Sequence, residues 1–390
     1  MELKARGSAY IVPDYSLTGD LLSFHRCGLQ YRMYNVGKLP STRPVQMWFG
    51  QFIHGVLEES FREFQESSSG PKSVYTPPSV DEIRTTCDLV IKRLAAQGLK
   101  ARNRDLVDTG IARATAAVQI LGPALFPLIK HAEVKLTGTR RFPDQDSSLN
   151  APAREADRYE MKGVVDVVTS VELGGHAFAG NFIVEAVRKA LPNGVSGSFE
   201  VIIDYKGMHR PTITRNSSGS ASLSEVYDWQ LQTYAELRGM QQGSLPVAAG
   251  ILIYLNELLP SWNDVKELKK SIANGTTDVV PLRGSAAEIA INSPRTGSPY
   301  PEIPVEFRVE RALRVIAITP QTQEVSARKF DEFVAQIESS RSAELATGNV
   351  VESWKQDSSD EATCTACDWR PICPSYNNGK TAKPPKPPRG

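Results

Sequence analysis

The 390-residue chain has little of three things that narrow the function of a protein: cysteine, net charge and long apolar runs. Five cysteines are too few for a secreted scaffold held together by disulfides. Lys and Arg number 45 against 44 Asp and Glu, so the chain lacks the overall basic excess of many nucleic-acid-binding proteins. No apolar run approaches the ~20 residues of a membrane-spanning helix, so we expect no membrane partner.

The remaining composition is that of an ordinary globular protein. Hydrophobic residues make up 41% of the chain and charged residues 23%, which excludes disorder throughout. The first residues, MELKARGSAY, contain no apolar core of signal-peptide length. Together with the low cysteine count, this predicts a reducing, cytoplasmic location. At about 150 residues per domain, the length predicts two or three structural units, or one large unit with insertions.

Hydrophobic periodicity separates a mostly helical part of the chain from a part that contains strands. Residues 1–15 are expected to be irregular, and Ser16 is a candidate helix N-cap. Helical spacing covers residues 17–29, 47–64 and 81–130. Strands are predicted at 132–137, 159–168, 199–206 and 248–255, with a helix at 227–240. This order predicts an α/β fold with a central mixed sheet flanked by helices.

The strand FEVIIDYK carries the first candidates for chemistry. Because side chains alternate along a strand, Asp204 and Lys206 share one face, roughly 7 Å apart. A carboxylate suits a hard metal ion, and a neighbouring ammonium can orient a water and offset developing negative charge. The pair therefore suits a hydrolytic metal site, with a plain ion pair at a strand end as the alternative.

Two further residues extend this candidate site. Asp166 lies in GVVDVV, where a buried carboxylate is costly unless it is paired or bound to a metal. A turn-forming or capping Asp is the alternative. His54 shares a predicted helical face with Leu57 and Phe61, so we expect it to point toward the core, either as a metal ligand or as a satisfied core residue.

Gln230 and Tyr234 are four residues apart on the predicted helix that follows the strand, and hence lie on one face. They are candidates for contact with a substrate phosphate or base. A half-buried amphipathic face is the alternative.

The cysteines give the sharpest local pattern. Cys364, Cys367 and Cys373 form C-x2-C-x5-C, which in a reducing compartment indicates a metal site. A tetrahedral site needs a fourth ligand, and we choose Cys27 because Cys87 lies inside an amphipathic helical stretch and resembles a small core residue.

The ordered set of motifs resembles a known family. A His, then G-x-x-D, D-x-K and Q-x-x-x-Y, with one early cysteine and a late C-x2-C-x5-C, is similar to the PD-(D/E)XK nucleases of the RecB and AddB type. The likeness is to their iron–sulfur branch, which includes CRISPR-associated adaptation exonucleases. The resemblance covers about 16–65, 131–256 and 360–376, and implies a restriction-endonuclease-like sheet.

The resemblance also implies roles for the motif residues. His54, Asp166, Asp204 and the carbonyl of Tyr205 would bind Mg²⁺ or Mn²⁺, with Glu133 as a further candidate, and Lys206 would be the catalytic lysine. Gln230 and Tyr234 would help to position DNA. The remaining assignment is a 4Fe-4S cluster on Cys27, Cys364, Cys367 and Cys373, with structural zinc as the alternative.

Two features depart from the family pattern. Asp204 stands where the family commonly has Glu, and the long spacing between Asp166 and Asp204 predicts an insertion within 171–198. We expect an N-terminal helical part with the first cluster cysteine at 1–65 and a linker with a helical insertion at 66–130. The nuclease core follows at 131–260, the part with the cluster cysteines at 261–376, and a disordered, basic, Pro-rich tail at 377–390.

The predicted function is a metal-dependent DNA nuclease, in particular an exonuclease acting on single strands in DNA repair, CRISPR adaptation or phage defence. No nucleotide-binding G-x4-GK(S/T) loop is present, so a helicase or other protein subunit would have to supply any unwinding. The alternative is an iron–sulfur DNA-binding or scaffolding subunit of a larger complex, without nuclease activity of its own.

Overall fold

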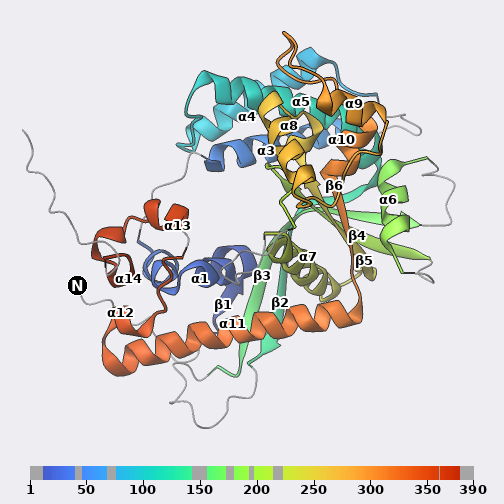
Figure 1. Cartoon of the computed structure of the whole chain (residues 1–390). Coiled ribbons are helices and arrows are strands. Elements are labelled where there is room, and N and C mark those ends of the chain that lie inside the picture. Colours follow the sequence, from blue (N-terminus) through green and yellow to red (C-terminus); the bar gives the residue numbers. More distant parts are fainter. Residues whose placement is uncertain are drawn as a thin grey trace, which may run out of the picture. The chain divides into compact units, whose positions relative to one another are not determined.

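The computed structural model describes residues 12–39, 46–67, 76–142, 156–172, 180–192, 197–213, 223–359 and 361–377 (Figure 1). The strands are β1 (Asp14–Ser16), β2 (Ile129–Arg141), β3 (Arg158–Glu172), β4 (Ser198–Lys206), β5 (Val247–Tyr254) and β6 (Leu313–Ala317). The first helices are α1 (Leu22–Arg26), α2 (Gly28–Tyr31), α3 (Gln46–Ser67), α4 (Val80–Ala96), α5 (Arg104–Leu125), α6 (Phe182–Ala190) and α7 (Leu223–Gly239). The later helices are α8 (Trp262–Ala273), α9 (Ala286–Asn292), α10 (Val305–Ala312), α11 (Pro320–Thr347), α12 (Val350–Ser353), α13 (Glu361–Thr365) and α14 (Pro374–Asn377).

The strands form one mixed, open sheet in the order β1-β3-β4-β5-β6, and β2 also pairs with β3. β3 and β4 are antiparallel, β4 and β5 are parallel, and β5 and β6 are antiparallel. Helix α7 makes the crossover between the two parallel strands, as a βαβ unit requires. The predicted α/β class, with a mixed sheet flanked by helices, is confirmed.

The chain divides into two compact units. The described residues of Met1–Thr42, Thr137–Gly163 and Glu324–Gly390 belong to unit 1, and those of Arg43–Leu136 and Val164–Gln323 belong to unit 2. Each unit thus draws on distant segments of the sequence. The candidate catalytic residues all lie in unit 2, and the four candidate cluster cysteines all lie in unit 1.

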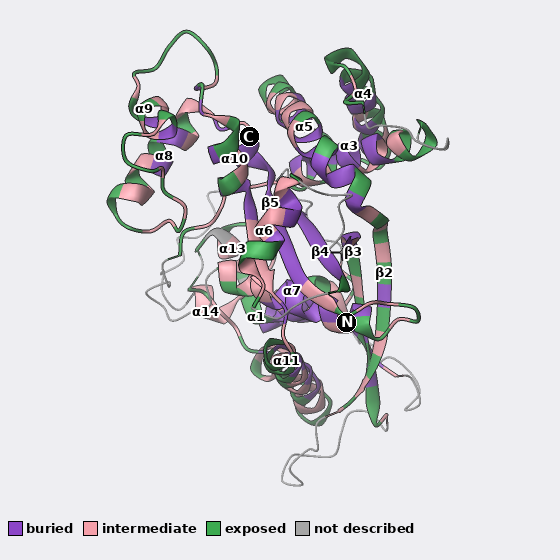
Figure 2. Cartoon of the chain, turned by 90° about the vertical axis from the view of Figure 1, so that its right-hand side faces the viewer, coloured by how far each residue is buried: buried purple, intermediate pink, exposed green. Residues whose placement is uncertain are grey.

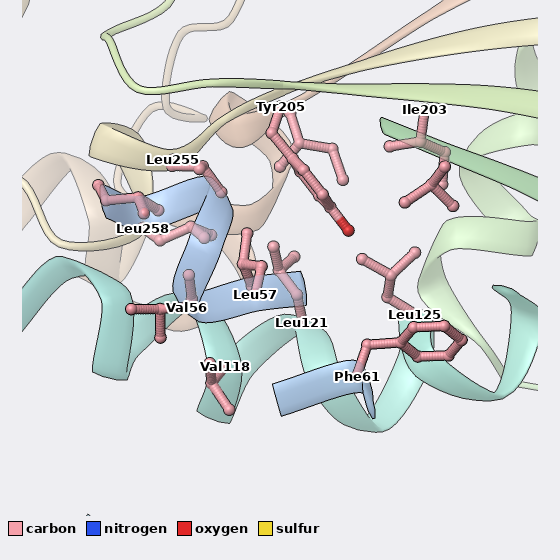
Figure 3. Packing of buried hydrophobic residues seen from close by; sticks show 14 of the residues in the cluster. Val56, Leu57, Phe61, Val118, Leu121, Leu125, Ile203, Tyr205, Leu255 and Leu258 are labelled. Atoms are coloured by element: carbon pink, nitrogen blue, oxygen red, sulfur yellow. The ribbon is translucent and has the colours of Figure 1, made fainter. Parts of the chain in front are cut away.

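In unit 2, strand β4 is buried along almost its whole length (Figure 2). The apolar side chains of one face, including Ile203 and Tyr205, pack on α3 and α5 through Leu57, Leu121 and Leu125 (Figure 3). Helix α7 packs on β4 and β5 through residues such as Leu231. A Cβ at Gly250 of β5 would lie 2.8 Å from Leu231 Cδ1, so this close helix–strand approach requires glycine.

Helices α8, α9 and α10 form a small helical group with its own core in unit 2 (Figures 1 and 2). Val265 and Leu268 of α8 pack with Ile291 of α9 and Phe307 of α10. Ser261 caps α8 through a reciprocal capping box with Asp264. The group is inserted between β5 and β6, and the sequence analysis assigned none of its helices.

In unit 1, the 28-residue helix α11 presents acidic side chains to buried partners. Asp331 accepts hydrogen bonds from Arg140 Nε and Nη2, at 3.0 and 2.6 Å, and from the Tyr159 hydroxyl. Glu338 accepts from the hydroxyl of Tyr15. Further along, Glu344 holds Arg32 in a two-bond pair and accepts from the indole of Trp354. Charge-assisted bonds therefore anchor this helix in addition to the apolar packing of residues such as Phe330 and Val334.

Most of the predicted elements are confirmed, with small shifts at their ends. Ser16 is an N-cap, and its hydroxyl accepts from the Gly19 N–H. The stretch 81–130 proves to be two helices, α4 and α5, followed by a short 3-10 turn and the start of β2. Residues 171–198 contain helix α6, and Cys87 is fully buried in the core as expected. The tail beyond residue 377 lies outside the described residues.

Two expectations about the outline of the chain need correction. The lead-in 1–15 is not wholly irregular, because β1 begins at Asp14 and pairs in parallel with β3 from Glu160. The linker expected from residue 66 begins later, since α3 continues to Ser67.

Among the described helices, the segment Arg104–Leu128 is long and apolar enough to cross a membrane. Most of that segment is buried against α3 and α4, which is typical of a core helix.

Removing Arg238 should destabilise unit 2 strongly. Glu200 is fully buried on β4 and is bound by Arg238 at 2.6 and 2.8 Å and by Lys130 at 3.2 Å. Arg238→Met leaves this carboxylate with one partly exposed partner, so the free energy of unfolding should fall by about 3–5 kcal/mol in urea titrations. Arg188→Met, which breaks an exposed pair with Glu185, should change it by less than ~0.5 kcal/mol. Equal losses in the two variants would contradict this account.

Candidate active site

Asp204 and Lys206 stand at the C-terminal end of β4, on the side of the strand that faces α7. Lys206 Nζ lies 2.5 Å from Asp204 Oδ2 and donates to Gln230 Oε1 of α7 at 2.8 Å. The ring of Tyr227, on the second turn of α7, covers the same ammonium at 4.4 Å from its centroid. The lysine is therefore held between a carboxylate, an amide and an aromatic face.

Gln230 links the lysine to the rest of this group. Its amide nitrogen donates to Asp204 Oδ1 at 3.2 Å and to the Tyr234 hydroxyl at 3.0 Å. Both Gln230 and Tyr234 are buried. In this structure Gln230 holds Asp204 and Lys206 in place, and Tyr234 in turn accepts a hydrogen bond from Gln230. A role of this pair in contacting DNA stays a prediction.

His54 and Asp166 approach the same strand end from other elements. His54 Nε2 of α3 lies 2.9 Å from the carbonyl oxygen of Tyr205. Asp166 Oδ2 of β3 accepts the Tyr205 N–H at 2.7 Å and lies 3.6 Å from His54 Nδ1. The β3–β4 register, with Val167 opposite Ile203, places Asp166 next to Asp204 across the strands. The structure thus brings together the side chains and the carbonyl that the sequence proposed as metal ligands.

A cavity of about 710 Å³ opens on this side of the site. Its lining includes His54 and Asp166, together with Glu133 of β2. Glu133 has φ +51°, a conformation that costs energy in a residue other than glycine. The sequence analysis did not single out two other lining residues, Glu58 and Arg93, which lie within 4.0 Å of each other.

Burial and like charges perturb the titration of the carboxylates here. Burial, and then the neighbouring charge of Asp204, raise the pKa of Asp166 well above its usual value. Burial and the charges of Asp166 and Glu58 raise the pKa of Glu133 in the same way. Burial lowers the pKa of His54, which favours the neutral form of the imidazole. A cluster of crowded acids beside a neutral imidazole is the electrostatic setting in which a cation binds favourably.

The donor set fits a hard divalent cation, although the fit is not that of a preformed centre. Within the described part of the chain, no three His, Cys, Asp or Glu side chains converge as a metal-binding group. Asp204 Oδ2 is nevertheless buried without a hydrogen bond and has only the ion pair with Lys206. Two carboxylates, one imidazole and one backbone carbonyl are suitable ligands for Mg²⁺ or Mn²⁺. These groups would have to move to surround one ion, because they do not converge in this structure.

In unit 1, the early and the late cysteines lie on segments that contact each other. The N–H of Leu29, two residues after Cys27, donates to the Lys355 carbonyl at 3.0 Å. The Tyr34 hydroxyl donates to Asp368 Oδ2 at 2.8 Å, beside Cys367. Burial and this hydrogen bond raise the pKa of Tyr34 to about 12. Residues near both ends of the chain are therefore joined next to the cysteine positions.

The three late cysteines lie in consecutive tight turns. The N–H of Cys367 donates to the Cys364 carbonyl at 3.2 Å, and the N–H of Cys373 donates to the Arg370 carbonyl at 3.3 Å. Cys27 is buried, whereas the late cysteines are half-buried. These side chains, like the carboxylates of unit 2, form no metal-binding group in the described residues. Four thiols suit either an iron–sulfur cluster or zinc, and the assignment stays a prediction.

Helical spacing contained one signal that the sequence analysis did not use. Tyr227 precedes Gln230 by three residues and Tyr234 by seven, so all three share one face of α7. Glu58 likewise follows His54 by one helical turn on α3. No comparable pattern points to Arg93, because its place at the cavity depends on how α4 packs against α3.

Comparison with known proteins adds no assignment: no protein-family model matches the chain, and no curated protein matches it.

The carboxylates should be needed for cation binding. Asp204→Asn and Asp166→Asn each remove a negatively charged oxygen donor, so the affinity for Mn²⁺ should fall at least roughly tenfold. Electron paramagnetic resonance of free Mn²⁺ measures this directly. Asp108→Asn makes the same change at an exposed position of α5 and should bind Mn²⁺ like the wild type. Unchanged affinity in all three variants would remove the metal site.

Proposed function

We propose that the protein is a metal-dependent nuclease that hydrolyses phosphodiester bonds of DNA, with the site at the end of β4 as its active centre. One observation carries the proposal. Lys206, Asp204 and Gln230 form a single bonded group, with Asp166, His54 and the Tyr205 carbonyl gathered at the same strand end. These are residues to which the PD-(D/E)XK resemblance assigns roles, and their proximity supports the proposal.

Each residue has a defined task in this proposal. Asp166, Asp204, His54 and the carbonyl of Tyr205 hold Mg²⁺ or Mn²⁺, which when bound polarises a phosphate oxygen and offsets its charge. Lys206 donates a hydrogen bond to the attacking water and offsets negative charge that develops on the phosphate. Gln230 and Tyr227 fix the direction of the ammonium, because they contact it from two sides.

The wider assignments follow from the same resemblance. We propose a restriction-endonuclease-like sheet, to which the mixed sheet with helices on its faces is similar in kind. We further propose that Cys27, Cys364, Cys367 and Cys373 bind a 4Fe-4S cluster that joins the chain ends. The protein would be an exonuclease that degrades single-stranded DNA in the cytoplasm. A helicase or another subunit would be its partner.

Nuclease activity should depend on Lys206. With a labelled single strand and Mg²⁺ or Mn²⁺, Lys206→Met should lower the cleavage rate by at least about 100-fold, since charge stabilisation by one such group is worth about 10² to 10³. Lys189→Met, at the end of α6 and outside the site, should cleave like the wild type. Comparable folding of the variants is checked by thermal unfolding. Equal rates for Lys206→Met and the wild type would leave a DNA-binding or scaffolding subunit as the better account.

Iron content should depend on Cys27 and not on Cys87. Anaerobically purified wild type should be brown and hold about four irons. Cys27→Ser should lose this iron, whereas Cys87→Ala should keep it, because Cys87 lies in the core of unit 2. A colourless wild type with one bound zinc would replace the cluster by a structural zinc site.

A further inference from the structure

A second cavity, of about 510 Å³, begins where β4 ends. Its lining comes from residues 208–212, from the turn after β5, and from helices α8 and α10. All of these residues belong to unit 2, and the helices are those of the small group between β5 and β6 (Figure 1). None of the candidate metal ligands lines this cavity.

The second cavity adjoins the lysine of the candidate active site. Met208 lines it, and the Met208 N–H donates to the Lys206 carbonyl at 2.7 Å. The Tyr227 ring that covers the Lys206 ammonium also donates through its hydroxyl to Met208 Sδ at 3.1 Å. Gly207, between Lys206 and Met208, packs on Gly50, which lines the first cavity. Both cavities therefore border the three-residue segment 206–208, which spans at most about 11 Å.

One wall of the second cavity is apolar. Leu268 of α8, Phe307 of α10 and Ile303, which lies just before α10, belong to the core of the helical group and line the cavity. Leu223 lines the cavity as well and is half-exposed. Such a surface can take the face of a nucleobase, since apolar and aromatic side chains stack on bases of any sequence.

Most of the charged groups at this cavity already have partners. Arg311 binds Glu257 at 2.8 and 3.0 Å. Arg210 binds Asp278 at 2.7 and 2.6 Å, and His209 Nε2 lies 3.1 Å from Asp264. Burial alone would lower the pKa of His209, but its bonds to Asp264 and Glu257 raise it. In these pairs, the charges of the cavity lining are neutralised by other groups of the protein.

Arg308 is different. Its Nη1 donates to the Leu258 carbonyl at 2.6 Å, whereas its Nε is buried and has no acceptor among the described residues. Among the described residues Arg308 forms no ion pair, and burial lowers its pKa, against the opposing effect of the Glu306 charge. A half-buried guanidinium with an unused donor, set in an apolar wall, is suited to a phosphate, which accepts such bonds readily.

We propose that the second cavity binds one nucleotide of the DNA strand, next to the phosphodiester that lies at Lys206. The base lies on the apolar wall of Leu268, Ile303 and Phe307, and Arg308 binds the phosphate of that nucleotide. The site thereby fixes the register of the strand relative to the lysine. This inference rests on the proposed nuclease function, which it extends by a specific substrate-binding subsite.

Binding is tested apart from cleavage. The full-length protein is titrated into a fluorescein-labelled ten-residue oligothymidylate in EDTA, and fluorescence anisotropy gives Kd. Arg308→Met keeps the apolar stem and removes the charge, so Kd should rise about tenfold. Leu223→Glu places a negative charge at the half-exposed rim and should also raise Kd severalfold.

Matched controls separate the cavity from general charge effects. Arg283→Met and Leu282→Glu make the same changes at exposed positions that line neither cavity, and both should keep the wild-type Kd within about twofold. If Arg308→Met has the Kd of the wild type, or only that of Arg283→Met, the nucleotide site is overturned.

Cleavage then distinguishes this inference from the function on which it rests. With metal present, Arg308→Met should raise KM about tenfold and keep kcat within about twofold, whereas Lys206→Met lowers kcat. Cleavage that needs Lys206 but is indifferent to Arg308 would overturn the nucleotide site alone. Binding that needs Arg308 without any cleavage by the wild type would overturn the nuclease and leave a strand-binding cavity.

Discussion

The organisation of unit 2 depends on strand β4 being covered on both faces while its last residues are charged. Apolar side chains such as Ile203 and Tyr205 must be removed from water, and α3 and α5 supply the surface that does so. Helix α7 covers the same strands because it is the crossover of the parallel pair. Two of these helices therefore also bring a polar residue to the strand end: His54 on α3 and Gln230 on α7.

Charge is concentrated there at an energetic cost that the surroundings offset. Asp166 and Asp204 are crowded in a buried place, where Lys206, the Tyr205 N–H and the Gln230 amide stabilise their ionised forms. Glu200, four residues earlier on the same strand, is buried even more deeply but has two cations of its own. Glu200 is therefore neutralised within the fold by two cations, whereas Asp204 has one, Lys206.

The sequence predicted those features that follow from alternation and from helical spacing. The two faces of FEVIIDYK, the common face of Gln230 and Tyr234, and the burial of Cys87 are of this kind. It did not predict α11, because that helix is anchored by Asp331, Glu338 and Glu344, and acidic anchors look like surface residues in a sequence. Strand β1 has only three residues, too few for a pattern.

The near-zero net charge also has a structural reading. At the second cavity, Arg210 and Arg311 are each matched by a buried or half-buried carboxylate, and near the first cavity Arg93 lies beside Glu58 and Glu59. These Arg side chains near the site are thus paired with carboxylates of the same unit. The net charge of the chain therefore says little about what the protein binds. Asp204 and Arg308 each keep a buried atom without a hydrogen bond among the described residues: Oδ2 of Asp204, whose partner is the Lys206 ammonium, and Nε of Arg308. Asp204 lies beside the lysine of the candidate active site, whereas Arg308 lines the second cavity. In the proposed function, the carboxylate would bind a cation and the guanidinium a phosphate, the two charges that a metal-assisted reaction on a phosphodiester strand needs.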